Sequence, residues 1–265
     1  MLIDTHAHLH FVDFDKDRKK VIEDARLEGI EKIILPGSDL ESSQKALQIA
    51  QPDENLFATV GVHPQYAAEF EPILEKELRK LIKKNQPVAI GETGLDFHRL
   101  EMENLKKVKA KQADLFRFQI ELSLEFNLPL IIHSRKAFAE TLQVLKEYQS
   151  KNIKGVFHCY TGGKKQIESV LALGFYFGLD GNLTYDEGLR NVASKIPLDK
   201  ILLETDSPLL TPIPFRGLRN EPKNVKLVAE SLAESKGLSF DQVAQTTTAN
   251  AQNLFNLKTK KKTKN

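Results

Sequence analysis

Two histidines separated by one residue stand near the start of the chain. They follow an apolar beginning at Leu2, as His6 and His8 with only an alanine between them. In an extended strand, residues two apart point to the same side, so both imidazoles can face one point and hold one divalent cation. The alternatives are a chance spacing or a solvated strand end. A catalytic metal site would need further ligands from elsewhere in the chain.

Further polar residues follow short apolar runs, at points where strands are expected to end. In chain order they are His63, Glu92, His133, His158 and Asp206. Each has an ordinary structural explanation alone, because a histidine can cap a strand, a glutamate between glycines can sit in a turn, and an aspartate can cap a helix. Taken jointly with His6 and His8, however, they supply a ligand set of four histidines and two carboxylates for two divalent metals.

The elements that precede these residues must bring them to one place. Short apolar runs expected as strands span 2–8, 32–35, 56–60, 88–90, 130–132, 155–157, 175–177 and 201–203. Helical patterns span 17–27, 40–50, 72–84, 105–126, 138–148, 166–173, 187–194, 225–235 and 241–254. This alternation predicts a closed (β/α)8 TIM barrel, in which the carboxyl ends of the strands surround one active-site cavity. An open doubly wound sheet is the alternative, although no Gly-x-Gly-x-x-Gly follows the first strand.

Composition is that of a soluble globular protein. The hydrophobic share is 41% and the charged share 28%, and no apolar run approaches the ~20 residues of a membrane helix. The chain starts with a strand rather than with the basic and apolar regions of a signal peptide, and its one cysteine, Cys159, leaves no internal disulfide. We expect a cytoplasmic protein without membrane association, and no obligate protein partner is indicated.

The last eight residues differ from the rest of the chain. They hold five lysines, and the 38 basic residues less these five leave 33 against 36 acidic residues, a net charge of −3. A single barrel domain is therefore expected over 1–257, followed by a disordered lysine-rich tail at 258–265. The tail is either simply solvated or adds weak affinity for nucleic acid.

Nine short motifs point to a known family. They are DTHAHL (4–9), GVHP (61–64), GETGLD (91–96), LIIHSR (130–135), FH (157–158), GNLTY (181–185), LLETDSP (202–208), RGLRNEP (216–222) and NAQNLF (250–255). As a set they make the chain resemble the TatD-type metal-dependent hydrolases, within the amidohydrolase-like barrels, from residue 1 to about 257. Departures are Phe97-His98, where the family more often has two aromatic residues, and the lysine tail.

The resemblance implies a role for each motif residue. Two divalent ions would share six ligands, with His6, His8 and Asp206 on the first, His133 and His158 on the second, and Glu92 between them. Related amidohydrolases often bridge with a carbamylated lysine instead, and a carboxylate bridge suits ions about 3.5–4 Å apart. Histidine-rich ligation suits Zn or Mn, whereas the family is often described as Mg-dependent.

Such a site predicts hydrolysis by a metal-activated hydroxide. Bound cations lower the pKa of water from 15.7 to about 7 and offset the charge that develops on substrate oxygens. The predicted catalytic residues are Glu92, as the bridging ligand, and Asp206, which would orient the water, accept its proton and pass it to the leaving group. Glu204, two residues earlier, is expected to support the site without binding metal.

Basic residues follow several strands of an otherwise mildly acidic body. They are Arg135, Lys136, Lys164, Lys165, Arg216 and Arg219. Arginine matches phosphate because its planar fork can bond two oxygens at once, so these positions favour a phosphodiester substrate; the alternative is that the loops are simply polar.

The resemblance implies a deoxyribonuclease that removes nucleotides from a 3′ end or nicks damaged DNA in repair. His63 and Arg135 would contact the phosphate, and Arg216 is a further expected substrate contact. Tyr160 and Phe97 are candidate stacking surfaces for bases.

Two other classes of function fit the same residues. The metal pair could attack a carbonyl centre, as in a D-aminoacyl-tRNA deacylase or a lactonase, because a barrel does not by itself choose the reaction. A non-catalytic metal-binding scaffold is the third class, and the complete ligand set argues against it. The expected partner is therefore a nucleic acid, either DNA or tRNA.

Overall fold

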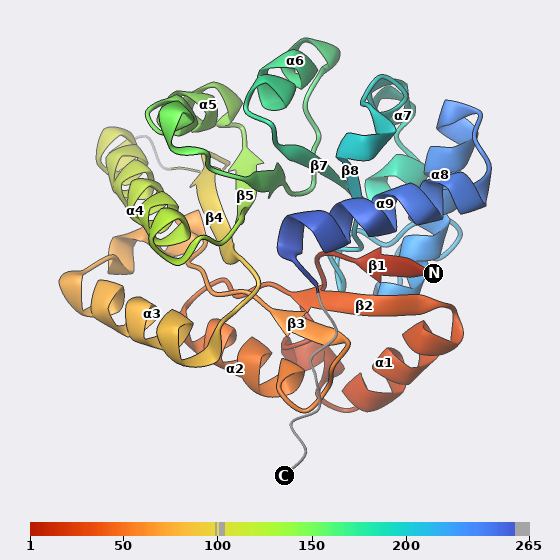
Figure 1. The fold of residues 1–265 in the computed structure, drawn as a ribbon, viewed down its shortest axis with the longest axis horizontal. Coiled ribbons are helices and arrows are strands. Elements are labelled where there is room, and N and C mark those ends of the chain that lie inside the picture. Colours follow the sequence, from red (N-terminus) through yellow and green to blue (C-terminus); the bar gives the residue numbers. More distant parts are fainter. Residues whose placement is uncertain (99, 101–103, 258–265) are drawn as a thin grey trace.

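The computed structural model describes residues 1–98, 100 and 104–257, so the predicted tail at 258–265 lies outside the described residues. Within this part of the chain the strands are β1 (Leu2–Asp4), β2 (Ile30–Leu35), β3 (Leu56–Ala58), β4 (Ile90–Asp96), β5 (Leu130–Arg135), β6 (Gly155–Phe157), β7 (Tyr176–Leu179) and β8 (Ile201–Leu203). The α-helices are α1 (Arg18–Leu27), α2 (Leu40–Ala50), α3 (Pro72–Asn85), α4 (Leu105–Phe126), α5 (Phe138–Lys146), α6 (Lys164–Ala172), α7 (Glu187–Ala193), α8 (Val225–Lys236) and α9 (Phe240–Phe255). Strands and helices alternate as the sequence predicts (Figure 1).

Two parallel sheets join into a closed barrel. One sheet holds β1 to β3 and the other holds β4 to β8, each in sequence order. A bridge between Val60 and Ile90 links β3 to β4, and a bridge between Ala7 and Ser207 links the segments that follow β1 and β8. The helices surround this ring of strands (Figure 1). The predicted (β/α)8 barrel is confirmed.

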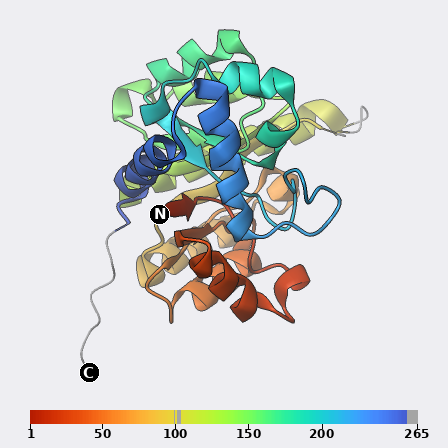
Figure 2. The ribbon, with the colours of Figure 1, turned by 90° about the vertical axis from the view of Figure 1, so that its right-hand side faces the viewer.

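Helix α9 covers the end of the barrel at which the strands begin. Its residues Leu254 and Phe255 pack in one buried cluster with Ile34 and other strand residues. Thr248 Oγ1 donates to the carbonyl oxygen of Met1 (3.1 Å), and Asn250 Nδ2 donates to that of Ile201 (2.8 Å). The strands end on the opposite side, where a long loop after β8 extends beyond the barrel (Figure 2).

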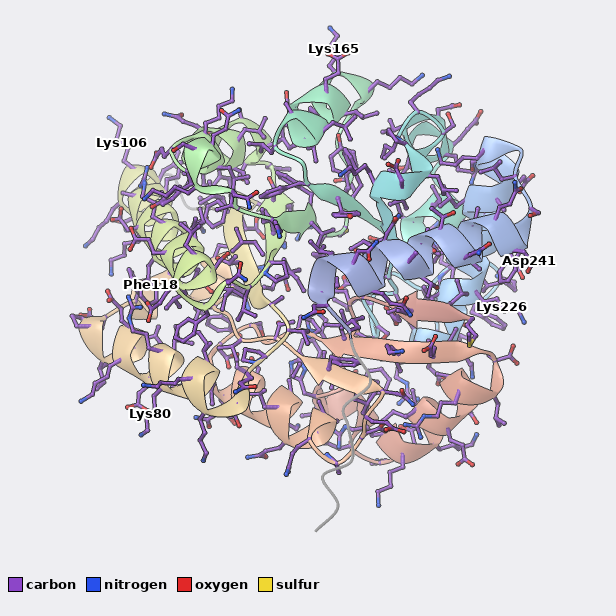
Figure 3. The ribbon with its side chains drawn as sticks, viewed as in Figure 1. Lys80, Lys106, Phe118, Lys165, Lys226 and Asp241 are labelled. Carbon is purple, nitrogen blue, oxygen red and sulfur yellow. The ribbon has the colours of Figure 1, made fainter. Side chains whose placement is uncertain are left out.

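Phenylalanines fill the space between strands and helices. Phe157, Phe175 and Phe177 are fully buried, and each such side chain contributes about 1.5–3 kcal/mol by leaving water. On the outside, charged side chains such as Lys106 project from the helices into solvent, whereas Phe118 on α4 is buried (Figure 3). None of the helices in the described part of the chain is long and apolar enough to cross a membrane.

Strand β1 is shorter than predicted. It ends at Asp4 rather than His8, because the backbone beyond Asp4 bonds to the other end of the chain instead of continuing one regular ladder. The amide of Thr5 donates to the carbonyl of Leu203 (3.0 Å), and the amide of His8 donates to that of Ser207 (2.8 Å). The two histidines therefore lie on a short extension that is held between β2 and β8.

Strand β4 is longer than predicted and shifted along the chain. It begins at Ile90 and continues to Asp96, so Glu92 lies inside a strand rather than in the turn after it. The glycines that resemble a turn signal serve close packing instead. A Cβ at Gly94 would clash with the carbonyl oxygen of His133 on β5, and the φ of +135° at Gly94 is accessible mainly to glycine.

Candidate metal centre

The first donor group joins residues from the two ends of the chain. His6 Nε2 lies 3.2 Å from His8 Nε2, and Asp206 Oδ1 lies 3.2 Å from His8 Nε2 and 3.8 Å from His6 Nε2. The amide of Asp206 donates to the carbonyl oxygen of His6 (2.9 Å), so the segment after β8 is held beside the segment after β1. All three side chains are buried, and their donor atoms point at one another.

Glu92 connects this group to the histidines of β5 and β6. Its Oε2 lies 3.6 Å from His6 Nε2, whereas its Oε1 lies 2.8 Å from His133 Nδ1 and 3.6 Å from His158 Nε2. One carboxylate oxygen thus faces each set of imidazoles. The six predicted ligands are brought together in one place, where His133 is partly exposed and the other five are buried.

The donor set fits divalent cations. Three groups, each with donor atoms within 4.8 Å of one another, are His6, His8 and Asp206; His6, Glu92 and His158; and His63, Glu92 and His133. Imidazole nitrogens and carboxylate oxygens are the ligands that zinc and related metals take in proteins. The Nδ1 atoms of His6 and His8 are buried without a hydrogen-bond partner, whereas the Nε2 atoms of both rings face the other donor atoms of the first group.

Both carboxylates of the centre are held ionised. Burial would raise the pKa of Glu92, but the neighbouring histidines, His158 foremost, hold it well below its ordinary value. For Asp206 burial again opposes ionisation, and a hydrogen bond from His8 together with the charge of His158 lowers the pKa. Two buried anions among imidazoles form a site that favours positive charge.

Glu204 orients His158, in agreement with the supporting role expected for it. Glu204 Oε1 lies 2.9 Å from His158 Nδ1 and also accepts the amide of Cys159 (2.6 Å). Burial lowers the pKa of His158, but the charges of Glu204 and Glu92 outweigh it and raise the pKa to about 10. With Nδ1 turned to Glu204, Nε2 faces the centre, as in carboxylate–histidine–metal arrangements.

Replacing Glu204 by glutamine is expected to weaken metal binding about tenfold, at the lower end of the range for such supporting groups, because the amide keeps an acceptor but loses the charge. Competition with a chelating dye measures the affinity. The exposed Glu187→Gln on α7 serves as the matched control. Equal affinities in the two variants would reduce Glu204 to a packing residue.

Two further carboxylates hold the site, and sequence reasoning did not assign them. Asp96 Oδ2 lies 3.1 Å from His133 Nε2, which turns Nδ1 of that ring toward Glu92. Asp4, fully buried, accepts from the amide (3.0 Å) and hydroxyl (2.6 Å) of Thr205 and from the amide of His6 (3.2 Å). Asp4 lies in the motif DTHAHL and Asp96 in the motif GETGLD, so their positions in these motifs were the sequence signal that could have identified them.

His63 belongs to the third donor group, but its ring is held differently from the others. Its Nε2 is 3.8 Å from Glu92 Oε1, and its Nδ1 accepts the amide of Gln65 (3.2 Å). Burial lowers the pKa of His63 to about 4, so the ring is neutral near pH 7. Because Nδ1 accepts, the proton of the neutral ring is on Nε2, and His63 presents a donor to the cavity rather than a lone pair.

The predicted substrate residues have unequal surroundings. Arg135 is exposed at the end of β5, two residues beyond His133, and Arg216 is exposed with its guanidinium 4.0 Å from the centre of the Tyr185 ring. Tyr160 is only 4% exposed and packs edge-on against Phe177 at 4.9 Å. The expectation that Tyr160 offers a free stacking face is therefore wrong, because its ring belongs to the core.

The structure also changes the expectations for Arg219 and Phe97. Arg219 is neutralised by Asp17 (2.7 Å) and Glu221 (2.9 Å), so its charge serves the loop rather than a substrate. Phe97 is half-buried, and the ammonium of Lys109 lies 3.9 Å from the centre of its ring. A lysine therefore already covers one face of Phe97.

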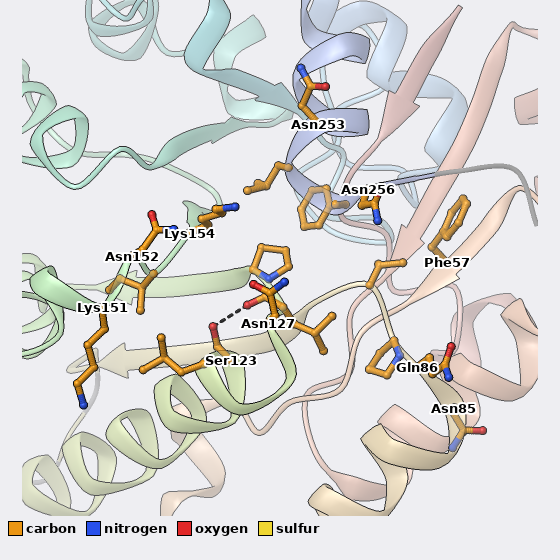
Figure 4. Close-up of a pocket in the computed structure, with 18 residues that line it drawn as sticks. Phe57, Asn85, Gln86, Ser123, Asn127, Lys151, Asn152, Lys154, Asn253 and Asn256 are labelled. Atoms are coloured by element: carbon orange, nitrogen blue, oxygen red, sulfur yellow. Dashed lines mark hydrogen bonds between the residues drawn. The ribbon is translucent and has the colours of Figure 1, made fainter.

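A depression of about 860 Å³ lies at the end of the barrel opposite to the metal centre (Figure 4). Its amide side chains include Gln86, Asn127 and Asn256, which end helices α3, α4 and α9 in the left-handed conformation at φ of 50–51°. Asparagine tolerates this conformation better than most residues. None of the described residues that line this depression is a histidine, aspartate or glutamate, so its size does not make it a metal centre.

Comparison with known proteins agrees with this geometry. The model of the family described as TatD related DNase matches residues 3–256. The protein named "uncharacterized metal-dependent hydrolase YabD" of Bacillus subtilis is 39% identical and covers 97% of this chain and 100% of its own length. The "3′-5′ ssDNA/RNA exonuclease TatD" of Erwinia tasmaniensis is 36% identical over 97% of this chain and all of its own length.

Solved structures agree as well. The crystal structure of YjjV, a TatD homologue from Escherichia coli, superimposes with a TM-score of 0.88 at 30% identity, covering 96% of this chain and 98% of that one. A TatD-family hydrolase from Entamoeba histolytica gives a TM-score of 0.86 at 28% identity, covering 96% of this chain and 97% of its own. The resemblance seen in the sequence is confirmed, and the chain belongs to the TatD family of metal-dependent hydrolases.

Proposed function

We propose that this hydrolase is a deoxyribonuclease that uses two divalent ions to remove nucleotides from the 3′ end of DNA. The observation that carries the proposal is the position of Glu92, with one oxygen toward His6 and the other toward His133 and His158. A carboxylate between two donor groups is the arrangement of two-metal phosphoesterases. A relative named as a 3′-5′ exonuclease supports the substrate class.

The protein groups divide the work of hydrolysis. Two bound ions, whether Mg, Mn or Zn, supply Lewis acidity and lower the pKa of water. Asp206 orients the water and takes its proton, since its carboxylate is ionised, buried and beside both His6 and His8. His63 donates through Nε2–H to a phosphate oxygen, and the exposed Arg135 pairs with the phosphate at the rim.

Two finer points belong to the same proposal. Arg216 contacts the substrate farther from the centre, where its side chain is exposed. The natural setting that we propose for this nuclease is DNA repair in the cytoplasm.

Metal removal tests the proposal directly. Protein stripped with a chelator is expected to leave 5′-labelled single-stranded DNA intact, and addition of Mg, Mn or Zn is expected to restore stepwise shortening. An aminoacyl-tRNA is followed in parallel, and Asp206→Asn, purified identically, controls for contaminating nucleases. Intact DNA with release of the amino acid would overturn the nuclease assignment and move the chain to the acyl-ester hydrolases.

A further inference from the structure

We infer that the loop after β8, residues 207–220, carries a stacking platform for an unpaired nucleobase, with Phe215 as the ring that the base contacts. This inference rests on the proposed function, because it names the form of nucleic acid that the same site accepts. Phe215 is absent from the residues that sequence reasoning selected, which placed stacking on Tyr160 and Phe97.

The loop is unusually apolar for an exposed segment. Four of its side chains, Leu209, Ile213, Phe215 and Leu218, are 53%, 50%, 45% and 67% exposed. They are half of the eight large hydrophobic residues that are exposed in the described part of the chain, and Phe215 is the one aromatic residue among the eight. Single exposed apolar residues are ordinary, but several on one short loop indicate a contact surface.

This surface adjoins the metal centre. The loop begins at the residue after Asp206, and the amide of Leu209 donates to the carbonyl oxygen of Asp206 (2.9 Å). Figure 2 shows the loop extending from the side of the barrel at which the strands end. The loop therefore extends from the same side of the barrel as the donor groups that would hold a terminal phosphodiester.

The base of the loop is fixed before any ligand binds. Asn220 is fully buried, and its Nδ2 donates to the carbonyl oxygens of Thr205 (2.9 Å) and Leu209 (2.7 Å). Farther out, the hydroxyl of Thr211 donates to the carbonyl oxygen of Leu218 (2.6 Å). A loop held in this way has little conformational entropy left to lose when a base stacks on it.

The charge beside Phe215 suits a nucleic acid. Arg216 lies over the ring of Tyr185 at 4.0 Å, and no carboxylate pairs with it among residues 1–98, 100 and 104–257. An aromatic face next to an unneutralised guanidinium matches the two parts of a nucleotide, a flat apolar base and an anionic phosphate. A protein partner or a second copy of this chain would not require an aromatic face beside an unpaired guanidinium, so the pairing favours a nucleotide.

The platform would supply a physical reason for the single-stranded substrate in the name of the Erwinia tasmaniensis relative, because it requires an unpaired end. A base can lie on Phe215 only if it has left its own stack, so single-stranded DNA or a frayed 3′ end should bind better than a blunt duplex. Stacking accepts all four bases, because each has a flat π-face, and thus gives no sequence preference.

Stacking can be measured apart from catalysis. We would place 2-aminopurine at the 3′ nucleotide of a single strand whose last linkages are phosphorothioates that resist cleavage, and titrate it with metal-loaded protein. Stacking on Phe215 is expected to quench the fluorophore, and Phe215→Ala to abolish the quenching and weaken binding about tenfold. Phe215→Tyr should restore both effects, and Ile73→Ala, which removes an exposed apolar side chain (66% exposed) on α3 outside the loop, should behave like the wild type.

The controls separate this inference from the proposed function. An oligonucleotide with an abasic 3′ end should bind the wild type and Phe215→Ala equally, because without a terminal base no stacking is possible in either protein. Undiminished quenching in Phe215→Ala, or an equal loss in Ile73→Ala, would overturn the platform while leaving the nuclease assignment intact. A wild type that neither binds nor cleaves any DNA would refute the nuclease assignment itself. A dimer in sedimentation that Phe215→Ala dissociates would make the loop a self-association surface instead.

Discussion

Replacing Asp206 by asparagine is expected to lower kcat about a thousandfold with little loss of stability. The amide has the same shape as the carboxylate but cannot accept a proton from water, and general-base catalysis typically contributes 10²–10⁴-fold. The fold should tolerate the change because Asp206 has a φ of +55°, a left-handed conformation that asparagine adopts as readily as aspartate. Its backbone hydrogen bond to His6 is also unchanged.

The measurement is single-turnover cleavage of 3′-labelled DNA, with thermal unfolding and bound metal determined on the same samples. Asp199→Asn is the matched control, since Asp199 is an exposed carboxylate just before the opposite end of β8. Wild-type turnover in Asp206→Asn would remove Asp206 from the proton transfer. A parallel loss of metal and activity would assign it to ligation alone.

Replacing Glu92 by alanine is expected to reduce the bound metal from two ions to fewer than two and to lower activity by more than about a hundredfold. Groups that only support metal ligands already cost 10–100-fold when mutated, and Glu92 faces both donor groups directly. The mutation also leaves His6, His133 and His158 without the anion between them. Equilibrium dialysis followed by elemental analysis gives the stoichiometry.

Glu92→Gln is the informative partner variant. Its amide fills the same space inside β4 but carries no charge and offers only one oxygen, so we expect one ion to remain and activity to stay low. Two ions retained in Glu92→Ala would show that the bridge is misassigned. Unfolding of the metal-free variants, compared with metal-free wild type, identifies any loss that comes from the fold alone.

The convergence of the donor residues could be predicted because it depends on topology. Parallel strands end on the same side of a barrel, so residues as distant as His6, Glu92 and His158 were expected to meet once the alternation of elements was recognised. The roles of these residues as ligands stay a prediction that metal analysis must test. The boundaries of β6 and β8, and of helices such as α4, were also correct, since turn residues flank them.

The burial of loop side chains and the close packing of strands could not be predicted, because both depend on contacts between segments that are distant in the sequence. Tyr160 and Phe215 are both aromatic residues in loops after strands, yet Phe138 and Phe177 pack against the ring of Tyr160, whereas Phe215 is 45% exposed. Likewise, Gly94 resembled a turn signal because the sequence does not reveal how closely the backbone of β5 approaches it. Local propensity carries no information about such neighbours.

The bridge between Ala7 and Ser207 also has a consequence for how the enzyme is made. Thr5 and Leu203, which bond beside it, are 198 positions apart, so a ribosome that adds 5–20 residues per second needs roughly 10–40 s between them. Until then a nascent chain carries His6 and His8 but no Asp206. By the proposed mechanism, a product that terminates early has neither a complete metal site nor a proton acceptor, and hydrolysis of nucleic acid is withheld until translation has passed the last strand.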